Sequence, residues 1–156
     1  MAAIRLMTMK NLFAFFLVIV AVMGMFGSLV YFFWQRDTGV GGVLTINDAT
    51  IRIVRAATPA ERAQGLSGKD ALSENEGMLF LFDHADYHAF WMRDMRFPLD
   101  IIWIDDNRVV VDMATHALPS SFPASFVPIE PARYVLEVSA GFADRHTIRI
   151  GDRAEF

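Results

Sequence analysis

The side chains that could do acid–base chemistry gather in one stretch, from Phe90 to Asp105. It contains three aspartates, and a pair of carboxylates can act as general acid and base or bind a cation. The alternative is structural: Asp105 belongs to a turn, where aspartate is common, and Asp100 caps backbone groups after Leu99. Asp100 differs, because it lies between apolar runs, where an unpaired carboxylate is costly unless it is hydrogen-bonded. The acid–base hypothesis therefore depends on Asp100 and on Glu137, which lies in a later strand and by simple alternation can also face solvent.

The same stretch carries aromatic and basic side chains that suit binding. Aromatic rings beside arginines can line an apolar or carbohydrate-binding groove, with the arginines as polar anchors. Strand side chains alternate between two faces, so about half of these residues should belong to the core. We expect Trp103 to be buried and Trp91 or Phe97 to keep an exposed face. The candidate residues for binding a ligand or partner are Trp91, Met92, Arg93, Arg96, Phe97, Asp100 and Glu137.

Several kinds of site are not indicated by the sequence. His84 and His88 lie close to Asp83 and Asp86, but residues four apart in a strand are separated by about 13 Å. Polar surface is therefore favoured over a metal site, unless a turn brings the histidines together. Ser67 lacks the Gly-x-Ser-x-Gly pattern of a nucleophile elbow, and no phosphate-binding glycine loop is present. The chain has no cysteine, and we predict no metal, no cofactor and no catalytic residue.

The beginning of the chain predicts a membrane anchor. Residues 11–34 contain no charged side chain, and a helix of this length spans about 36 Å, against a hydrocarbon core of about 30 Å. The apolar core of a cleaved signal peptide is shorter, roughly 7–15 residues. Arg5 and Lys10 precede the segment, so the positive-inside rule predicts residues 1–10 in the cytoplasm. Residues 35–42 are a glycine-containing linker, and residues 43–156 are expected outside the cytoplasmic membrane.

The charge of the chain limits its partners. From Arg36 onward there are 12 basic and 18 acidic residues, a net charge of −6. An acidic domain is a poor nucleic-acid binder, because affinity for phosphates depends on clustered lysines and arginines. The expected partners are the lipid bilayer, contacted through residues 11–34, and either a small ligand or an envelope protein, with no nucleic acid.

Residues 43–156 predict a small β domain. A helix should begin at Thr58, where Thr58 and Glu61 can form a capping box with Pro59 in the first turn, and should end at Gly65. A turn is expected over residues 83–86, and the four prolines of residues 118–131 predict a long surface loop. The expected strands are 43–46, 51–55, 77–82, 87–92, 100–104, 108–114, 133–138 and 147–150. About eight short strands and one short helix indicate a compact, mainly β sandwich or small barrel.

The chain also resembles a known family in the order and spacing of several short motifs. They are Gly65-Leu66, Gly77-Met78-Leu79-Phe80, Trp91-Met92, Pro98-Leu99-Asp100-Ile101, Leu136-Glu137 with Ala140-Gly141, and Gly151-Asp152. From about Val43 to its end the chain is similar to the domain-of-unknown-function family number 192, whose bacterial and archaeal members are often exported or membrane-anchored. The resemblance implies a mainly β, jelly-roll-like domain without an established activity. The family usually has Arg where this chain has Lys69, and Lys-Asn-Thr where it has Arg93-Asp94-Met95, which suggests a different ligand specificity here.

Three hypotheses for the function follow from these patterns. The preferred one is a noncatalytic, membrane-tethered module that binds a ligand or an envelope partner through residues 91–100 and the proline-rich loop. The second is an envelope hydrolase or lyase that uses Asp100 and Glu137, for which a pair of carboxyls about 5–9 Å apart in one cleft would be the signature. The third is a structural accessory protein that associates through its anchor and its edge strands.

Overall fold

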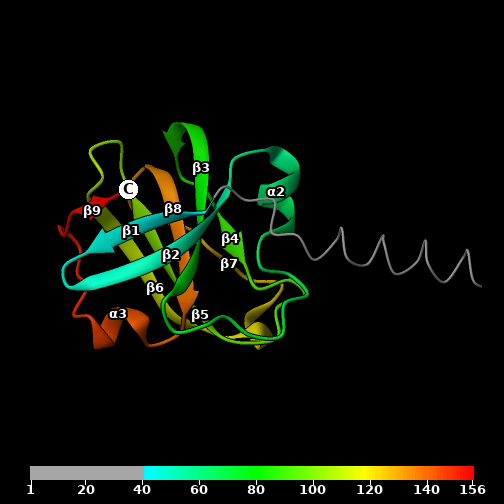
Figure 1. Cartoon of the computed structure of the whole chain (residues 1–156). Helices are drawn as coiled ribbons and strands as arrows, with labels where there is room; N and C mark the ends of the chain where they lie inside the picture. Colours follow the sequence, from blue (N-terminus) through cyan, green and yellow to red (C-terminus); the bar gives the residue numbers. More distant parts are fainter. Residues whose placement is uncertain (1–40) are drawn as a thin grey trace, which may run out of the picture. The chain divides into compact units, whose positions relative to one another are not determined.

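The computed structural model describes residues 41–156 (Figure 1). Two short α-helices and nine strands make up this part of the chain, so the mainly β class is confirmed. None of the helices in residues 41–156 has the length and apolar character to cross a bilayer, and the predicted span 11–34 lies outside the described residues. In chain order the elements are β1 (Gly42–Ile46), β2 (Ala49–Ala56), α2 (Pro59–Gln64), β3 (Glu76–Asp86), β4 (Phe90–Trp91), β5 (Leu99–Ile104), β6 (Val110–Ala117), the 3-10 helix η1 (Pro119–Ser121), β7 (Ser125–Phe126), β8 (Ala132–Ser139), α3 (Phe142–Arg145) and β9 (Ala154–Glu155).

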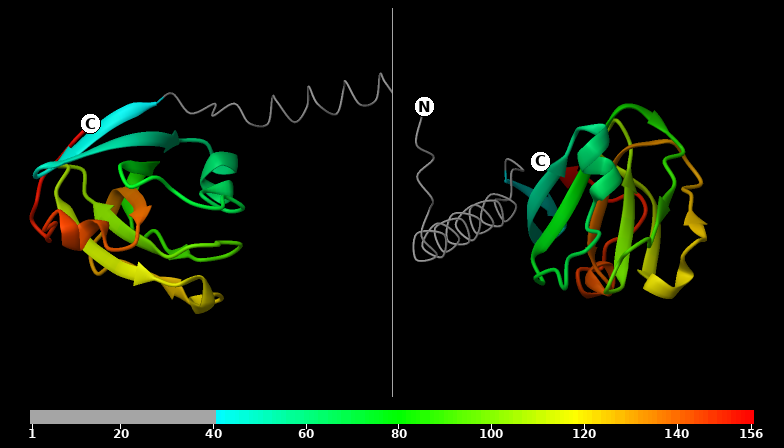
Figure 2. Two further views of the ribbon diagram at one scale, coloured as in Figure 1. Left: turned by 60° about the horizontal axis from the view of Figure 1, so that its bottom comes forward. Right: turned by 90° about the vertical axis from the view of Figure 1, so that its right-hand side faces the viewer.

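In place of the two packed sheets of a jelly roll, seven strands form one twisted sheet in the order β6-β5-β8-β3-β2-β1-β9. A separate ribbon pairs β4 with β7 (Figure 2). All neighbours are antiparallel except β2 and β3, which run parallel because α2 lies in the connection between them. α2 therefore lies at one end of the domain, beside the β4–β7 ribbon (Figure 1).

Two apolar clusters pack against opposite faces of the sheet. Along β5 all six residues are buried, and they alternate between the clusters: Ile102 belongs to one and Ile101 and Trp103 to the other. Trp103 is 1% exposed, which confirms its predicted place in the core. A central strand that is covered on both faces explains why residues 101–104 form an uninterrupted apolar run.

The local signals near the start of the domain are confirmed. β1 and β2 form the predicted hairpin, with Asn47 at a positive φ of 55° in the turn. α2 begins at the predicted capping box, in which the Thr58 hydroxyl accepts from the Glu61 N–H and the Glu61 carboxylate accepts from the Thr58 N–H. The Thr58 N–H, followed by that of Ala57, holds the pKa of Glu61 below its ordinary value. Gly65 ends the helix at a φ of 51°.

Several expected boundaries are wrong. The predicted turn over residues 83–86 is the outer part of β3, which rejoins β8 after a register shift. Within the predicted strand 87–92, only Phe90–Trp91 form a strand, and the predicted loop 118–131 contains η1 and β7. No strand forms over residues 147–150; the chain instead forms α3 before them and β9 after them. The alternating isoleucines of this segment do not mark a strand face, because only Ile148 is buried in the core, at 5% exposed, whereas Ile150 is 58% exposed.

Candidate functional site

A pocket of about 270 Å³ opens between α2, β3 and the ribbon strand β4. Four stretches of the chain form its walls. The first stretch contributes residues 62–67 and the second Phe80 and Phe82; the third contributes residues 89–91 with Arg93 and Met95, and the fourth Glu137. Most of these side chains are apolar or aromatic, and the titratable ones are Arg62, Arg93 and Glu137. The pocket thus combines an apolar lining with three charged or ionisable groups, as small-molecule sites commonly do.

Glu137 lies in the central strand β8, between β3 and β5. It pairs with Met78 on one side and Ile101 on the other, so its side chain shares the face of the sheet that carries their apolar cluster. The residue is 5% exposed, and the solvent-facing alternative is therefore wrong. Burial raises the pKa of the Glu137 carboxyl from its ordinary value of 4.5 to about 8, and no ion pair or hydrogen bond within residues 41–156 opposes that shift.

An aromatic wall fixes the shape of the pocket. The Phe90 ring makes an edge contact with Phe80 at a centroid distance of 4.8 Å and another with Trp103 at 6.2 Å. Edge-to-face contacts of this kind hold rings in defined orientations. The next residue, Trp91, is 51% exposed, as predicted for Trp91 or Phe97. The wall is therefore rigid near the core and ends in an exposed indole.

Two arginines belong to the lining, and both are held over aromatic rings. The Arg62 guanidinium lies 5.0 Å from the centroid of Phe82 and donates from Nη1 to the carbonyl oxygens of Ala57 and Leu81. The Arg93 guanidinium lies 5.1 Å from the centroid of Trp91. Guanidinium stacking of this kind restrains the side chain while leaving N–H donors at the edge of the plane.

Two hydrogen bonds connect the loop after α2 to the loop after β4. Ser67 Oγ donates to the carbonyl oxygen of Arg93 at 3.1 Å, and the Gly68 N–H donates to that of Asp94 at 3.2 Å. Asp94 adopts a positive φ of 57°, which aspartate tolerates better than most residues. These bonds fix the position of Arg93 relative to α2, although the two segments are about 26 residues apart in the chain.

Asp100 has a structural role on the other face of the sheet. It is 0% exposed, and its two carboxylate oxygens accept from the backbone N–H groups of His116 at 2.8 Å and Ala143 at 3.0 Å. These bonds tie β5 to the end of β6 and to the first turn of α3. Asp100 does not line the pocket, so the structure does not bring Asp100 and Glu137 into one cleft.

The other predicted binding residues are divided between pocket, core and surface. Trp91 and Arg93 line the pocket with Glu137, whereas Met92 is 1% exposed and packs in the core. Arg96 is exposed and pairs with Asp70 outside the pocket. Phe97 is half-buried against the same apolar cluster as Trp103.

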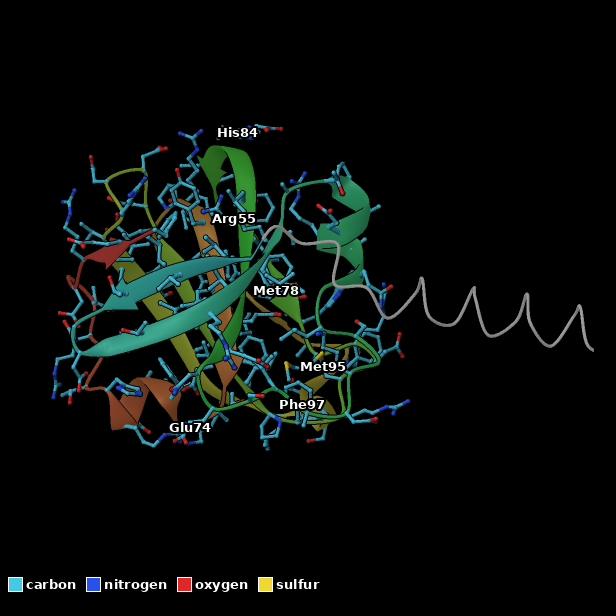
Figure 3. All side chains as sticks on the ribbon, in the orientation of Figure 1. Arg55, Glu74, Met78, His84, Met95 and Phe97 are labelled. Atoms are coloured by element: carbon cyan, nitrogen blue, oxygen red, sulfur yellow. The ribbon has the colours of Figure 1, made fainter. Side chains whose placement is uncertain are left out.

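Of the lining residues, only Trp91, Arg93 and Glu137 were predicted as binding residues; those that the sequence did not single out include Arg62, Phe80, Phe82 and Met95. Arg62 and the two phenylalanines lie before the predicted loop, and only the pairing of β3 with β8 brings Phe80 close to Glu137. Figure 3 shows Met95 on the side of the domain that carries α2, and His84 at the top of the view, beside the end of β3. His84 and His88 have ring centroids 6.3 Å apart, and no group of three potential metal-ligating side chains occurs among residues 41–156.

The comparisons with known proteins agree on one family. The model of DUF192, described as an uncharacterized ACR, matches residues 42–156. A UPF0127 protein of Pyrococcus furiosus is 33% identical over 73 residues, which are 47% of this chain and 57% of that protein. The alignment thus spans little more than half of that relative's length.

Two solved structures share the fold. A protein of unknown function from Novosphingobium aromaticivorans is 34% identical, with a TM-score of 0.71 over 74% of this chain and 85% of that chain. A chain from Sinorhizobium meliloti described as a "putative transcription regulator" is 29% identical, with a TM-score of 0.71 over 75% of this chain and 94% of that chain. Since the family model covers nearly the whole described part, this chain belongs to the uncharacterized DUF192 family.

Proposed function

We propose that the chain is a noncatalytic domain that binds a small molecule in the pocket above Glu137. The observation that supports this most strongly is a buried carboxyl that lines a cavity and has no ion-pair partner within residues 41–156. An unpaired carboxyl in an apolar site destabilises the fold, and glutamine or leucine would cost less there. A polar anchor for a ligand gives a reason for glutamate at this position.

Binding is favoured over hydrolysis because the pocket holds one carboxyl. Carboxylate-pair hydrolases use two such groups on either side of the scissile bond, and Asp100 lies on the opposite face of the sheet with both oxygens accepting hydrogen bonds. Ser67, the one hydroxyl in the lining, donates to the carbonyl oxygen of Arg93. Neither residue therefore supplies a second catalytic group next to Glu137.

We further propose that residues 11–34 anchor the domain in the cytoplasmic membrane, with residues 43–156 outside the cytoplasm. The support is the length of the uncharged segment and the position of Arg5 and Lys10 before it. Protease added to spheroplasts should then digest the domain. Protection of the domain until detergent dissolves the membrane would contradict this topology.

A second candidate, docking of a partner protein, is supported by exposed apolar side chains around the proline-rich loop. Leu118, Phe122, Val127 and Ile129 are between 45% and 72% exposed. Their proximity along the chain suggests a contact surface, since clustered exposed apolar groups mark interaction sites. In-cell crosslinking should lose a partner with Ile129→Asp but keep it with the control Ile150→Asp, which changes an exposed isoleucine outside this loop. Equal crosslinking of both variants would contradict this surface.

The nucleic-acid role suggested by the description of the Sinorhizobium meliloti chain is not proposed for this chain. In this chain the residues from Arg36 onward carry a net charge of −6, which disfavours binding to phosphates. The two arginines of the pocket are each stacked on a ring and do not form a basic stripe.

The proposal is tested by screening a library of small molecules against the full-length chain with saturation-transfer NMR. Library members should bind the wild type and the Tyr87→Ala variant, because Tyr87 is exposed and lies outside the pocket lining. Trp91→Ala should weaken the binding of the same members about tenfold, since it removes the exposed end of the aromatic wall. Binding that is equal in all three proteins would contradict the proposal.

A further inference from the structure

We infer that the pocket takes a small zwitterion, with an ammonium group at the Glu137 carboxylate, an apolar body between the rings, and an acidic group at Arg93. This inference rests on the proposed function and specifies the class of ligand. It depends on three features of the pocket: the environment of Glu137, the aromatic wall, and the placement of the two arginines.

The environment of Glu137 favours a cation at the inner end of the pocket. Glu137 is 5% exposed, on the face of the sheet that carries the apolar cluster of Met78 and Ile101, and it lines the cavity together with Phe80 and Phe90. Ring faces attract cations, and this attraction is stronger where water is excluded. An ammonium group also brings three N–H donors, which can satisfy carboxylate oxygens that accept no hydrogen bond from residues 41–156.

Charge balance requires Glu137 to lose a proton when such a ligand binds. Burial alone raises the pKa of this carboxyl to about 8, so near neutral pH the empty pocket holds mainly the protonated form. When the ammonium binds, the carboxyl O–H bond breaks, the proton passes to the buffer, and no other bond changes. The other charged side chains of the lining are Arg62 from α2 and Arg93 from the loop after β4; β3 contributes Phe80 and Phe82.

The arginines favour an acidic group at the outer end of the ligand. A simple cation would meet two guanidinium groups in the same lining, which is unfavourable without a compensating anion. The Arg93 side chain is 47% exposed and stacked on Trp91, and its Nε lies 3.9 Å from a carboxylate oxygen of Asp94. The N–H donors of its two Nη atoms are therefore left for a ligand near the exposed end of the wall. A planar guanidinium fork matches the geometry of a carboxylate.

The body of the ligand is apolar. Besides the ionisable groups, the lining contains the apolar side chains of Leu66, Phe90, Trp91 and Met95. A volume of about 270 Å³ is near the lower end of the range for small-molecule pockets, which is roughly 300–1,000 Å³. A short methylene chain with charged ends therefore fits both the size and the chemistry of the pocket.

Calorimetry with a series of ω-amino acids, from 4-aminobutanoate to 8-aminooctanoate, tests this inference. The full-length chain is placed in phosphatidylglycerol nanodiscs, whose lipids carry no ammonium group. One chain length should bind about tenfold more tightly than the alkylamine or the alkanoate of the same length. The binding enthalpy near pH 7 should depend on the ionisation enthalpy of the buffer, in the amount expected for release of most of one proton.

Three variants separate the roles of the charged groups. Glu137→Gln should weaken the binding of the tightest amino acid about tenfold and abolish the buffer dependence of the binding enthalpy. Arg93→Gln should also weaken binding but keep the buffer dependence, because Glu137 still ionises. Tyr87→Ala, an exposed aromatic residue outside the lining, should behave as the wild type.

Two outcomes overturn the inference. If the alkylamine or the alkanoate binds as tightly as the amino acid, or if Glu137→Gln binds equally well, the ligand is not held as a zwitterion. The proposed function would still hold after that result if neutral members of the library bind the wild type and bind Trp91→Ala more weakly. If neither the series nor the library binds, the inference and the proposed function fail together.

Discussion

Asp100 and Glu137 lie on adjacent strands of one sheet, yet their carboxyl groups point to opposite faces. Asp100 is opposite Val138 in the β5–β8 ladder, and Glu137 is opposite Ile101. Glu137 and Val138 are neighbours in β8, so their side chains point to opposite faces of the sheet. The side chain of Asp100 points to the same face as that of Val138, its partner in the ladder, and therefore away from the face of Glu137. Asp100 is bound to two backbone N–H groups, whereas Glu137 lines the pocket. One buried carboxyl thus stabilises the fold and the other is available to a ligand.

The free energy of unfolding should fall as the pH rises, because of Glu137. Its pKa is about 8 in the folded chain and ordinarily 4.5, so the folded state binds the proton more tightly. The stability linked to this proton is complete below about pH 4.5 and is lost as the pH rises to about 8. At roughly 1.4 kcal/mol per unit of difference between these two pKa values, the full loss is on the order of 5 kcal/mol. Urea unfolding at about pH 5, 7 and 9 should show this loss relative to Glu137→Gln, and parallel profiles for the two proteins would contradict the assigned pKa.

Replacing Asp100 should destabilise the fold without changing the pocket. Asp100→Ala leaves the N–H groups of His116 and Ala143 without their acceptor, which should cost about 3 kcal/mol in urea unfolding. The matched control is Asp83→Ala, because Asp83 is exposed, and its effect should stay within about 0.5 kcal/mol. A ligand of the pocket should bind the folded Asp100→Ala variant as tightly as the wild type. Weaker binding by this variant with unchanged stability would instead place Asp100 in the site.

Gly77 should not tolerate a side chain. A Cβ at this position would lie 2.9 Å from the carbonyl oxygen of Glu137 and 3.1 Å from side-chain atoms of Leu136 and Val138. Gly77→Ala should therefore push β8 away from β3 and cost roughly 1–3 kcal/mol by thermal or urea unfolding. Gly41→Ala is the control, since an added Cβ there meets nothing within 4 Å. Equal stability of the two variants would show that the β3–β8 contact is looser than described.

Loss of the helix cap should reduce stability and loosen the pocket. Thr58→Ala removes the acceptor of the Glu61 N–H, which should cost about 1 kcal/mol. Hydrogen exchange should speed up over residues 59–64, the helix that carries Arg62. Thr58→Ser keeps a hydroxyl at the cap and should restore the slow exchange. If Thr58→Ala exchanges at the wild-type rate, the capping box does not hold α2 in place.

The parts of the fold that the sequence could predict depend on neighbours in the chain. The capping box at Thr58, the stop at Gly65 and the hairpin turn at Asn47 each involve residues within a few positions of one another. The apolar run of residues 101–104 correctly indicated a buried strand. Such signals act through local hydrogen bonds and burial, so they can be read before the fold is known.

The site could be predicted only in part, because it depends on register between distant strands. Trp91 and Arg93 were expected from the composition of their loop. The face on which Glu137 lies is set by its pairing with Met78 and Ile101, and a shift of one residue would reverse it. Phe80 likewise reaches the pocket through β3, and nothing near Trp91 in the chain indicates it. The same dependence on tertiary packing produced the erroneous strand at 147–150, where only Ile148 is buried.

The central claim, that the pocket above Glu137 holds a small ligand, is tested most directly by NMR of methionine methyl groups. Met95 lines the pocket, whereas Met113 packs with the cluster on the other face of the sheet. In the full-length chain labelled at methionine methyls, a ligand found in the library or amino-acid series should shift the Met95 signal and leave Met113 in place. Saturation of that shift should give the calorimetric affinity. A ligand that shifts Met113 and leaves Met95 unchanged would contradict the claim.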